Sequence, residues 1–256
     1  MKKGIVLLSG GLDSCVTAAI AIKELGAENV TAVSVFYAQK HSAEIHHAEK
    51  IAKHYRINHR IIDLSETGIF DGSNCSLLQT SSEAIPQESY AEQIAKSKAE
   101  GKSVLVSSFV PYRNGLFLSS VAALAMSVYP EEEVNVYLGN HADDAAGNAY
   151  PDCSQEFVEA CGKAIEIGTY GKVKLVSPLV SWNKGRVVEE GLKLHAPFHL
   201  TTSCYNGGDY ACGIHCATCI DRVAAFRANG VIDPIKYAEP IDWSGCSPID
   251  YIEEEA

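Results

Sequence analysis

The stretch Ser9-Gly10-Gly11-Leu12-Asp13-Ser14, written SGGLDS, directly follows an apolar run at residues 4–8. An apolar run that ends in a glycine turn is typical of a buried parallel strand that feeds a helix. Such a turn presents backbone N–H groups at the positive end of the helix, where anions bind. Because Ser9 and Ser14 add hydroxyl donors, the stretch predicts a binding site for a phosphate chain. The alternative is an ordinary glycine turn with Asp13 in the first turn of the helix.

Short apolar runs alternate with helical patterns along the rest of the sequence. Strands are predicted at residues 3–8, 30–36, 60–64, 107–111, 134–139 and 173–177, and helices at 114–129, 153–167, 183–195 and from Ser42 to Tyr55. This alternation implies right-handed crossovers between parallel strands that are covered on both faces. We therefore expect an α/β fold with an open, mostly parallel, Rossmann-like sheet. Residues 68–100 have few periodic apolar positions and are expected to form an insertion or a mobile flap.

The composition restricts the class of partner. The chain has 256 residues, of which 46% are hydrophobic, so it can bury a substantial core. Its 32 acidic and 21 basic residues leave a formal net charge of −11, which repels a phosphate backbone, so nucleic acid is not an expected partner. No charged-then-apolar leader precedes the first strand, and no apolar run reaches the roughly 20 residues of a bilayer span. We expect a cytoplasmic protein with no membrane partner.

Four of the nine cysteines gather near the C-terminus. Cys204, Cys212, Cys216 and Cys219 follow the pattern C-x7-C-x3-C-x2-C, with glycines between them that permit tight turns. Four thiolates at such short separations can close a tetrahedral site, so a structural Zn²⁺ is the expected occupant. An iron–sulfur cluster also fits four cysteines, and His215 could replace one thiol. Disulfides are not expected in a cytoplasmic protein.

Two familiar phosphate-binding patterns are missing from SGGLDS. A Walker loop ends in Gly-Lys-Ser/Thr, whereas this stretch has no lysine, and the pattern G-x-G-x-x-G is also absent. SGGLDS instead resembles the pyrophosphate-binding loop, or PP-loop, of the ATP pyrophosphatases. The resemblance implies a fold of the adenine nucleotide alpha hydrolase type and an enzyme that splits ATP between its α- and β-phosphates. Residues 1–200 would form this nucleotide-binding domain, and residues 201–256 a zinc-binding knuckle region.

A wider set of motifs narrows the family. SGGLDS occurs together with FYAQKHSAEIHHAEKIAKHY (36–55), VPYRNGLFLS (110–119), GNHADDAAGNAYPDC (139–153) and the four cysteines. This combination resembles the 7-cyano-7-deazaguanine synthase family of queuosine precursor biosynthesis. The resemblance implies a homodimeric ligase that converts 7-carboxy-7-deazaguanine, ammonia and ATP with Mg²⁺ to 7-cyano-7-deazaguanine (preQ0) by adenylating first the acid and then the amide. One departure is the spacing C-x3-C, where the family has C-x2-C, which puts the geometry of the knuckle in doubt.

The resemblance also implies roles for individual residues. ATP would be bound by Leu8, Ser9, Gly10, Gly11, Leu12, Asp13, Ser14, Cys15 and Lys40; Ser9, Asp13, Ser14 and Lys184 would act in catalysis; and Arg113, Asp144 and Asp152 would bind the substrate. Several of these residues have simpler interpretations. Lys40 and His41 could form a solvated helix start, Arg113 a structural ion pair, Asn114 or Asp152 a helix N-cap, and Lys184 a solvent-exposed side chain.

Two other functions compete with this interpretation. A PP-loop tRNA thiolase also adenylates a base oxygen, but it would need a tRNA-binding face that an acidic chain without a basic appended domain does not predict. A non-enzymatic binding module built around the cysteines would leave SGGLDS without a role.

Overall fold

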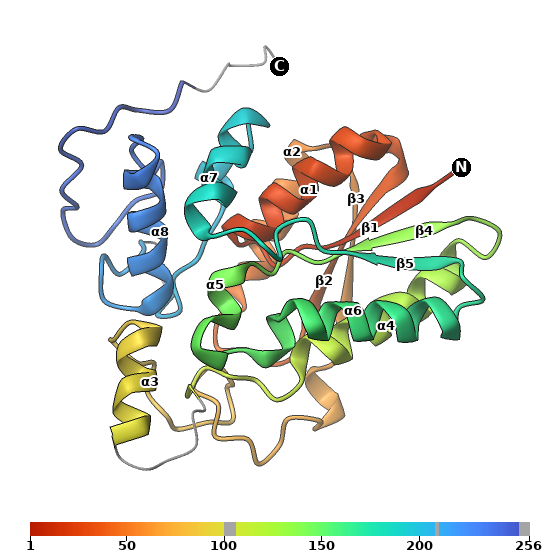
Figure 1. The fold of residues 1–256 in the computed structure, drawn as a ribbon, viewed down its shortest axis with the longest axis horizontal. Helices are drawn as coiled ribbons and strands as arrows, with labels where there is room; N and C mark the ends of the chain where they lie inside the picture. The colour runs from red at the N-terminus through yellow and green to blue at the C-terminus, as the bar shows by residue number, and fades with distance from the viewer. Residues whose placement is uncertain (100–105, 208–209, 251–256) are drawn as a thin grey trace.

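The computed structural model describes residues 1–99, 106–207 and 210–250. In this part of the chain, β1 (Lys3–Leu7), β2 (Val30–Phe36), β3 (Asn58–Asp63), β4 (Val134–Tyr137) and β5 (Val173–Val176) form one parallel sheet (Figure 1). The strand order is β3-β2-β1-β4-β5. The chain therefore builds the sheet outward from β1 in one direction and then in the other. This confirms the open parallel α/β fold.

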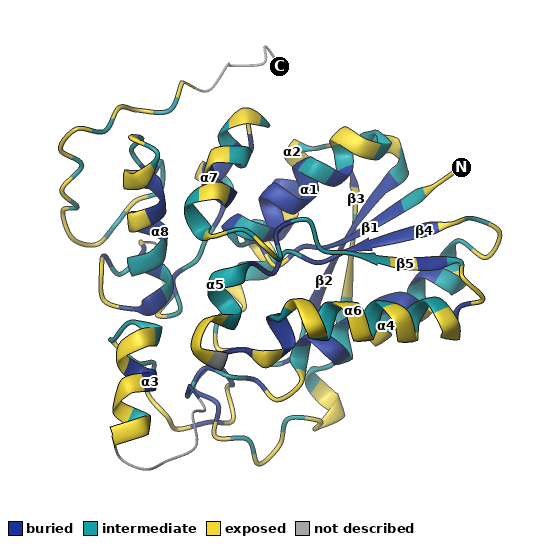
Figure 2. Ribbon diagram, viewed as in Figure 1, coloured by how far each residue is buried: buried dark blue, intermediate teal, exposed yellow. Residues whose placement is uncertain are grey.

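Helices cover both faces of the sheet (Figure 1). α1 (Leu12–Leu25), α2 (Ala43–His54) and α7 (Lys184–Lys193) lie on one face, and α4 (Arg113–Val128) and α6 (Gln155–Gly168) lie on the other. Side chains of β1 alternate between the two cores: Val6 packs with the first group and Ile5 with the second. β1 is buried along most of its length (Figure 2), as expected for the central strand of a doubly covered sheet.

The remaining elements surround the carboxyl ends of the strands, except that one 3₁₀ turn directly precedes β2 at the opposite edge of the sheet. They are α3 (Tyr90–Ala99), α5 (Ala142–Ala145), α8 (Ala217–Ala228) and the short 3₁₀ turns η1 (Ala27–Asn29), η2 (Ser65–Thr67), η3 (Ala146–Asn148), η4 (Pro151–Cys153) and η5 (Phe198–Leu200). α8 packs against α7 and contributes Phe226 to the core. Every helix in the described part of the chain is too short or too polar to traverse a lipid bilayer.

Arg222 of α8 joins the C-terminal region to the rest of the molecule. Its guanidinium makes a fully buried, bidentate pair with Asp233, with Nε–Oδ2 and Nη2–Oδ1 distances of 2.6 and 2.9 Å. Nη1 also donates to the hydroxyls of Thr201 (2.8 Å) and Ser203 (3.1 Å). Because a buried charge needs both a counter-charge and hydrogen bonds, this residue holds Thr201 and Ser203 in place just before the first cysteine of the knuckle.

One predicted strand is wrong. Residues 107–111 form turns, in which the Ser107 carbonyl accepts from the Ser76 amide (2.7 Å) and the Val110 carbonyl accepts from the Arg113 amide (3.3 Å). Val110 is apolar because it is buried against other loop residues. Pro111 has no backbone N–H group to donate to a neighbouring strand. The other predicted strands and helices are confirmed, with ends that differ by a few residues.

Residues 68–99 pack against the body of the protein. Leu77 and Leu78 are buried against Tyr37 and Val110, and the Gln79 amide donates to the Ala38 carbonyl (2.9 Å). α3 ends the segment, although the sequence shows no clear helical period there. Residue 100, the last of the predicted insertion, lies outside the described residues.

Candidate active site

A cleft of about 240 Å³ opens at the carboxyl ends of β1 and β4. This is the point at which the strand order reverses, and ligands of open parallel sheets bind there. The two strands are followed by Ser9 and by Gly139, and both of these residues line the cleft. A Cβ on Gly139 would lie only 2.8 Å from Thr17 Oγ1, so glycine is required for β4 to approach α1 closely.

The loop after β1 is braced by its own serines. Ser14 Oγ donates to the Gly11 carbonyl (3.0 Å), and the Ser9 amide donates to Ser14 Oγ (3.2 Å). Gly10 has φ +84°, and a Cβ there would lie 2.3 Å from the Glu44 carbonyl, so the loop fits tightly against α2. Gly11 is the N-cap of α1 and supplies no capping side chain, which leaves the positive end of the helix open to an anion in the cleft.

The predicted phosphate-loop residues divide into two groups. The cleft is lined by Leu8, Ser9, Gly11, Asp13 and Ser14, whereas Gly10 is buried against α2 and does not line it. Leu12 and Cys15 are instead buried in the core beneath the loop, and burial raises the pKa of the Cys15 thiol to about 12. Their side chains therefore anchor α1 and do not face a ligand.

Lys184 reaches the phosphate loop from the opposite side of the cleft. Its Nζ lies 2.5 Å from Asp13 Oδ2 and 3.3 Å from Nε2 of His141, the residue that ends the loop after β4. Its backbone amide donates to Asp143 Oδ2 (2.7 Å) at the start of α7. The Lys184 side chain is only 14% exposed, so the solvent-exposed alternative for this residue is wrong.

Asp13, His141 and Asp144 complete a charged cluster with Lys184. His141 Nε2 lies 3.7 Å from Asp13 Oδ1 and 3.4 Å from Asp144 Oδ1. Burial alone would raise the pKa of Asp13, but the charges of Lys184 and His141 bring it below its ordinary value. Burial, together with the charge of Asp13, raises the pKa of Asp144. Asp13 Oδ1 is buried and makes no hydrogen bond within the described residues, so one carboxylate oxygen remains available to a ligand.

Three charged or aromatic side chains line the cleft beyond β2. Arg113 Nη1 donates to the Tyr37 hydroxyl (3.2 Å). Burial raises the pKa of Glu44 to about 7, while the charge of Arg113 and a hydrogen bond to Gln39 act in the opposite direction. Arg113 therefore lies in the cleft as predicted, next to a carboxyl group that the sequence did not single out.

Lys40 and Asp152 do not line the cleft, whereas Asn114 lines it and is held in place by Asp152. Lys40 is exposed, and its Nζ donates to the Glu83 carbonyl (2.9 Å). Asp152 Oδ2 accepts the backbone amide of Asn114 (3.0 Å) and thereby caps α4, while Asn114 Nδ2 donates to the Asp152 carbonyl (3.0 Å). The N-cap position of α4 belongs to Tyr112, so the interpretation of Asn114 as an N-cap is wrong. The hydrogen bonds that these three residues make are contacts within the protein.

Several residues that line the cleft were missed. They are Glu44, Tyr90, His141, Tyr205 and Asp221. The sequence contained a signal for His141, which comes shortly after the strand predicted at residues 134–139. In an open parallel sheet the ligand site lies where the strand order reverses, so the loop after a strand that neighbours the first one is expected to line it. Burial raises the pKa of Asp221, which extends the acidic side of the cleft from α8.

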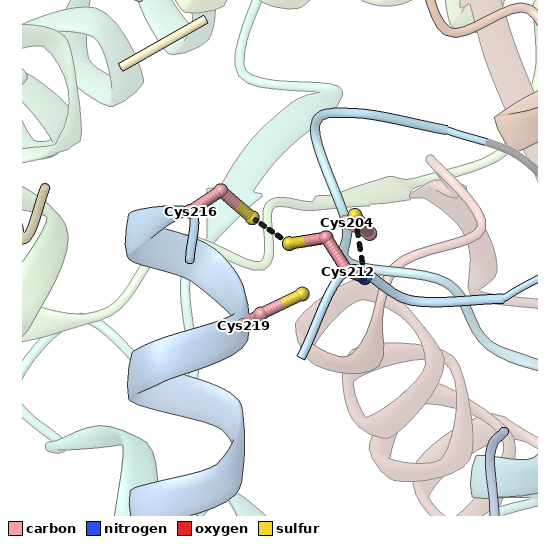
Figure 3. A group of neighbouring side chains, drawn as sticks. All are labelled: Cys204, Cys212, Cys216 and Cys219. Carbon is pink, nitrogen blue, oxygen red and sulfur yellow. Dashed lines mark hydrogen bonds between the residues drawn. The ribbon is translucent and has the colours of Figure 1, made fainter. Parts of the chain in front are cut away.

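The four cysteines of the knuckle come together (Figure 3). Their Sγ atoms all lie within 4.8 Å of one another. Cys216 and Cys219 come from the start of α8, whereas Cys204 and Cys212 come from the preceding loop, and the Cys212 amide donates to Cys204 Sγ (3.3 Å). His215 is outside the group and pairs with Glu239 (3.0 Å). Tetrahedral thiolates about 2.3 Å from Zn²⁺ lie about 3.8 Å apart, so the cluster could hold one such metal ion despite the longer cysteine spacing.

Comparisons with known proteins agree on one family. The model described as "Queuosine biosynthesis protein QueC" matches residues 3–230. The 7-cyano-7-deazaguanine synthase of Caldicellulosiruptor saccharolyticus is 38% identical over 241 residues, covering 94% of this chain and 98% of that protein. The enzyme of the same name from Oceanobacillus iheyensis is 37% identical over 239 residues, covering 92% of this chain and 98% of that protein.

Among solved structures, the NMN synthetase of Francisella tularensis matches with a TM-score of 0.44 and 18% identity, covering 79% of this chain and 65% of that one. The family match rests on sequence, along nearly the whole chain, and confirms the resemblance that begins with SGGLDS. The chain therefore belongs to the QueC family of queuosine biosynthesis proteins, whose members include the 7-cyano-7-deazaguanine synthases.

Proposed function

We propose that this chain converts 7-carboxy-7-deazaguanine and ammonia to 7-cyano-7-deazaguanine at the expense of ATP, in queuosine biosynthesis. The observation that carries the proposal is the open N-terminus of α1 beside Lys184 and Asp13, in a chain of the QueC family. An uncapped helix end and a lysine together favour a pyrophosphate group in the cleft.

The chemistry explains why such a cradle is needed. Ammonia does not displace oxide from a carboxylate at neutral pH, but it can displace AMP from an acyl adenylate, forming the C–N bond as the C–O bond breaks. The amide oxygen is adenylated in turn, and the nitrile forms as AMP leaves with that oxygen and two protons leave the nitrogen. Both activations release pyrophosphate, so one cradle can serve both steps. No protein nucleophile is required.

The residues of the cleft have distinct roles in this scheme. Lys184 and the first backbone amides of α1 stabilise the negative charge of the departing pyrophosphate. Ser9 and Ser14 hold the loop in shape through their hydrogen bonds to it. Asp144, whose pKa is raised, and Arg113 lie where they can contact the deazaguanine. A carboxylate can accept two parallel N–H bonds, which is the pattern that the guanine edge presents.

Asp13 is the residue best placed to hold Mg²⁺ with ATP. Its Oδ1 is buried without a hydrogen-bond partner in the described residues, and carboxylate oxygens suit this ion. Mg²⁺ would neutralise phosphate charge during transfer. Lys184 keeps Asp13 ionised and oriented.

The test is to incubate the protein with 7-carboxy-7-deazaguanine, ammonium, ATP and Mg²⁺ and to identify the products by mass spectrometry. We expect 7-cyano-7-deazaguanine, AMP and pyrophosphate, and no nitrile when ammonium is omitted. Tight filter binding of tRNA together with no turnover of the small molecule would contradict the proposal and favour a tRNA-modifying enzyme.

The cysteine knuckle is proposed to hold a structural Zn²⁺. Four closely spaced thiols leave no open coordination position, whereas an iron–sulfur cluster places several iron and sulfide atoms between the thiolates and holds them farther apart. Metal analysis should return about one zinc per chain. Visible iron–sulfur absorbance, or full stability after complete removal of the metal, would contradict this assignment.

Three further proposals concern the assembly, the location and the organisation of the chain. The chain is a homodimer, which light scattering after gel filtration can test. It works in the cytoplasm on small molecules, with no nucleic acid or membrane partner. Residues 1–200 form the nucleotide-binding part and residues 201–256 the knuckle region. The Thr202 amide donates to the Gly10 carbonyl (2.9 Å), which joins the start of the knuckle region to the phosphate-binding loop.

A further inference from the structure

Two segments that are far apart in the sequence meet over the cleft. The Tyr90 hydroxyl, from α3, lies 2.9 Å from the Tyr205 hydroxyl, which follows the first cysteine of the knuckle. Gln87 Nε2 donates to Asn206 Oδ1 (3.4 Å) beside them. Ile85 packs both against the buried group that contains Tyr37 and Leu78 and against the cysteines of the knuckle. The segment that ends in α3 and the knuckle therefore form one continuous wall in this structure.

A third tyrosine completes this wall. The rings of Tyr90 and Tyr150 are 5.4 Å apart and nearly perpendicular (87°), and the Tyr150 hydroxyl lies 2.5 Å from that of Ser108. Tyr90, Tyr150 and Tyr205 all line the cleft. Each tyrosine hydroxyl can both donate and accept a hydrogen bond. In the Tyr90–Tyr205 pair one hydroxyl donates, and the other keeps its proton for a different acceptor.

The charged cluster of Asp13, His141, Asp144 and Lys184 lines another part of the same cleft, and Tyr150 joins the two parts because its backbone amide donates to the Asp144 carbonyl (3.2 Å). Asp13 and Lys184 lie at the open end of α1. The cleft thus has a charged part suited to phosphates and an aromatic part suited to a planar ring with polar edges. The carboxyl group of the substrate must be at the charged part to be adenylated, which directs its ring system toward the aromatic part.

We propose that Tyr90, Tyr150 and Tyr205 form the binding site for the planar deazaguanine ring, and that the Tyr90–Tyr205 hydroxyl pair sets the affinity for it. This inference rests on the proposed function and adds to it the residues that recognise the ring. The knuckle acquires a second role, because the residue that follows Cys204 is part of the substrate site. The nucleotide depends on the loop after β1 and not on this wall.

The test is calorimetric binding of 7-carboxy-7-deazaguanine, and separately of ATP, to the wild type and to Tyr205→Ala, Tyr205→Phe and Tyr90→Phe. Loss of an aromatic contact with a base costs about 1–3 kcal/mol, so Tyr205→Ala should weaken binding of the acid about 5- to 150-fold. The two Phe variants keep the ring, should fold as the wild type does, and should weaken binding of the acid several-fold by losing the paired hydroxyl. Each Phe variant should raise KM for the acid while KM for ATP stays unchanged.

Tyr129→Phe is the matched control. It removes a hydroxyl bonded to Thr31 Oγ1 (2.9 Å) at the start of β2, away from the cleft, and should change neither affinity. Variants that bind the acid as the wild type does, or that lose ATP and acid equally, overturn this inference while the proposed function stands. A wild type that binds no deazaguanine overturns both.

Discussion

The two parts of the cleft are built in different ways. In the charged part, six consecutive residues supply a loop that is braced by its own serines and closed by one distant lysine. In the aromatic part, Tyr90, Tyr150 and Tyr205 come from three separate segments and meet only through tertiary packing. The comparison shows that the chemistry of activation is encoded locally, whereas the surface that recognises the substrate depends on how distant segments pack.

Removal of Arg222 should have the largest effect on the aromatic part, because this residue fixes Thr201 and Ser203 just before the knuckle. Arg222→Met leaves Asp233 buried without its counter-charge, which typically costs about 3–5 kcal/mol in the free energy of unfolding. Urea unfolding measures this change.

The control for that experiment is Lys163→Met, which breaks the exposed pair with Glu166 (3.2 Å) and should cost less than about 1 kcal/mol. The double variant Arg222→Met/Asp233→Leu should lose less stability than Arg222→Met alone, since no charge is then left unpaired. Equal losses in Arg222→Met and Lys163→Met would mean that the pair does not hold the knuckle region in place.

Removal of Lys184 tests the charged part. Lys184→Met should lower kcat about 10²- to 10³-fold, the usual cost of losing one group that stabilises developing charge. Lys193→Met is the matched control on the same helix, since Lys193 pairs with the exposed Glu189 and the half-buried Glu190 of α7 and does not line the cleft. Steady-state release of pyrophosphate measures both variants, and equal rates in the two would remove Lys184 from the mechanism.

The two parts of the cleft also differ in how well their residues could be predicted from the sequence. SGGLDS was recognisable because its residues are contiguous, whereas Lys184 was assigned only through the resemblance to the family. Tyr90 and Asp221 carry no such signal, since their place in the cleft depends on contacts between segments that no local pattern records. The predicted strand at residues 107–111 failed for a related reason: loop residues buried by tertiary contacts resemble a strand in composition.

The smallest effect is expected from Glu44, which lines the cleft near Arg113. The pKa of Glu44 rises from the ordinary value of 4.5 to about 7, so the folded state holds this proton more tightly than the unfolded state. Stability contributed by the protonated group is therefore lost as the pH rises from about 4.5 to about 7. Glu44→Gln should remove this component, so its free energy of unfolding should fall less than that of the wild type between pH 5 and pH 8.

Urea unfolding at both pH values measures the effect. Glu66→Gln, at an exposed position in η2, is the control and should follow the wild type. If Glu44→Gln shows the same pH dependence as the wild type, Glu44 titrates as an exposed carboxyl would, and the cleft around Glu44 is open to water.

The count of AMP per nitrile tests the central claim, that one cleft activates the same carbon twice. The described residues contain one SGGLDS loop, and both adenylations must use it. Starting from 7-carboxy-7-deazaguanine, each nitrile should accompany two AMP and two pyrophosphate. Starting from 7-amido-7-deazaguanine without ammonia, it should accompany one of each, and Lys184→Met should slow both reactions by the same factor. Release of ADP and phosphate, or an amide that is never converted to the nitrile, would contradict the account.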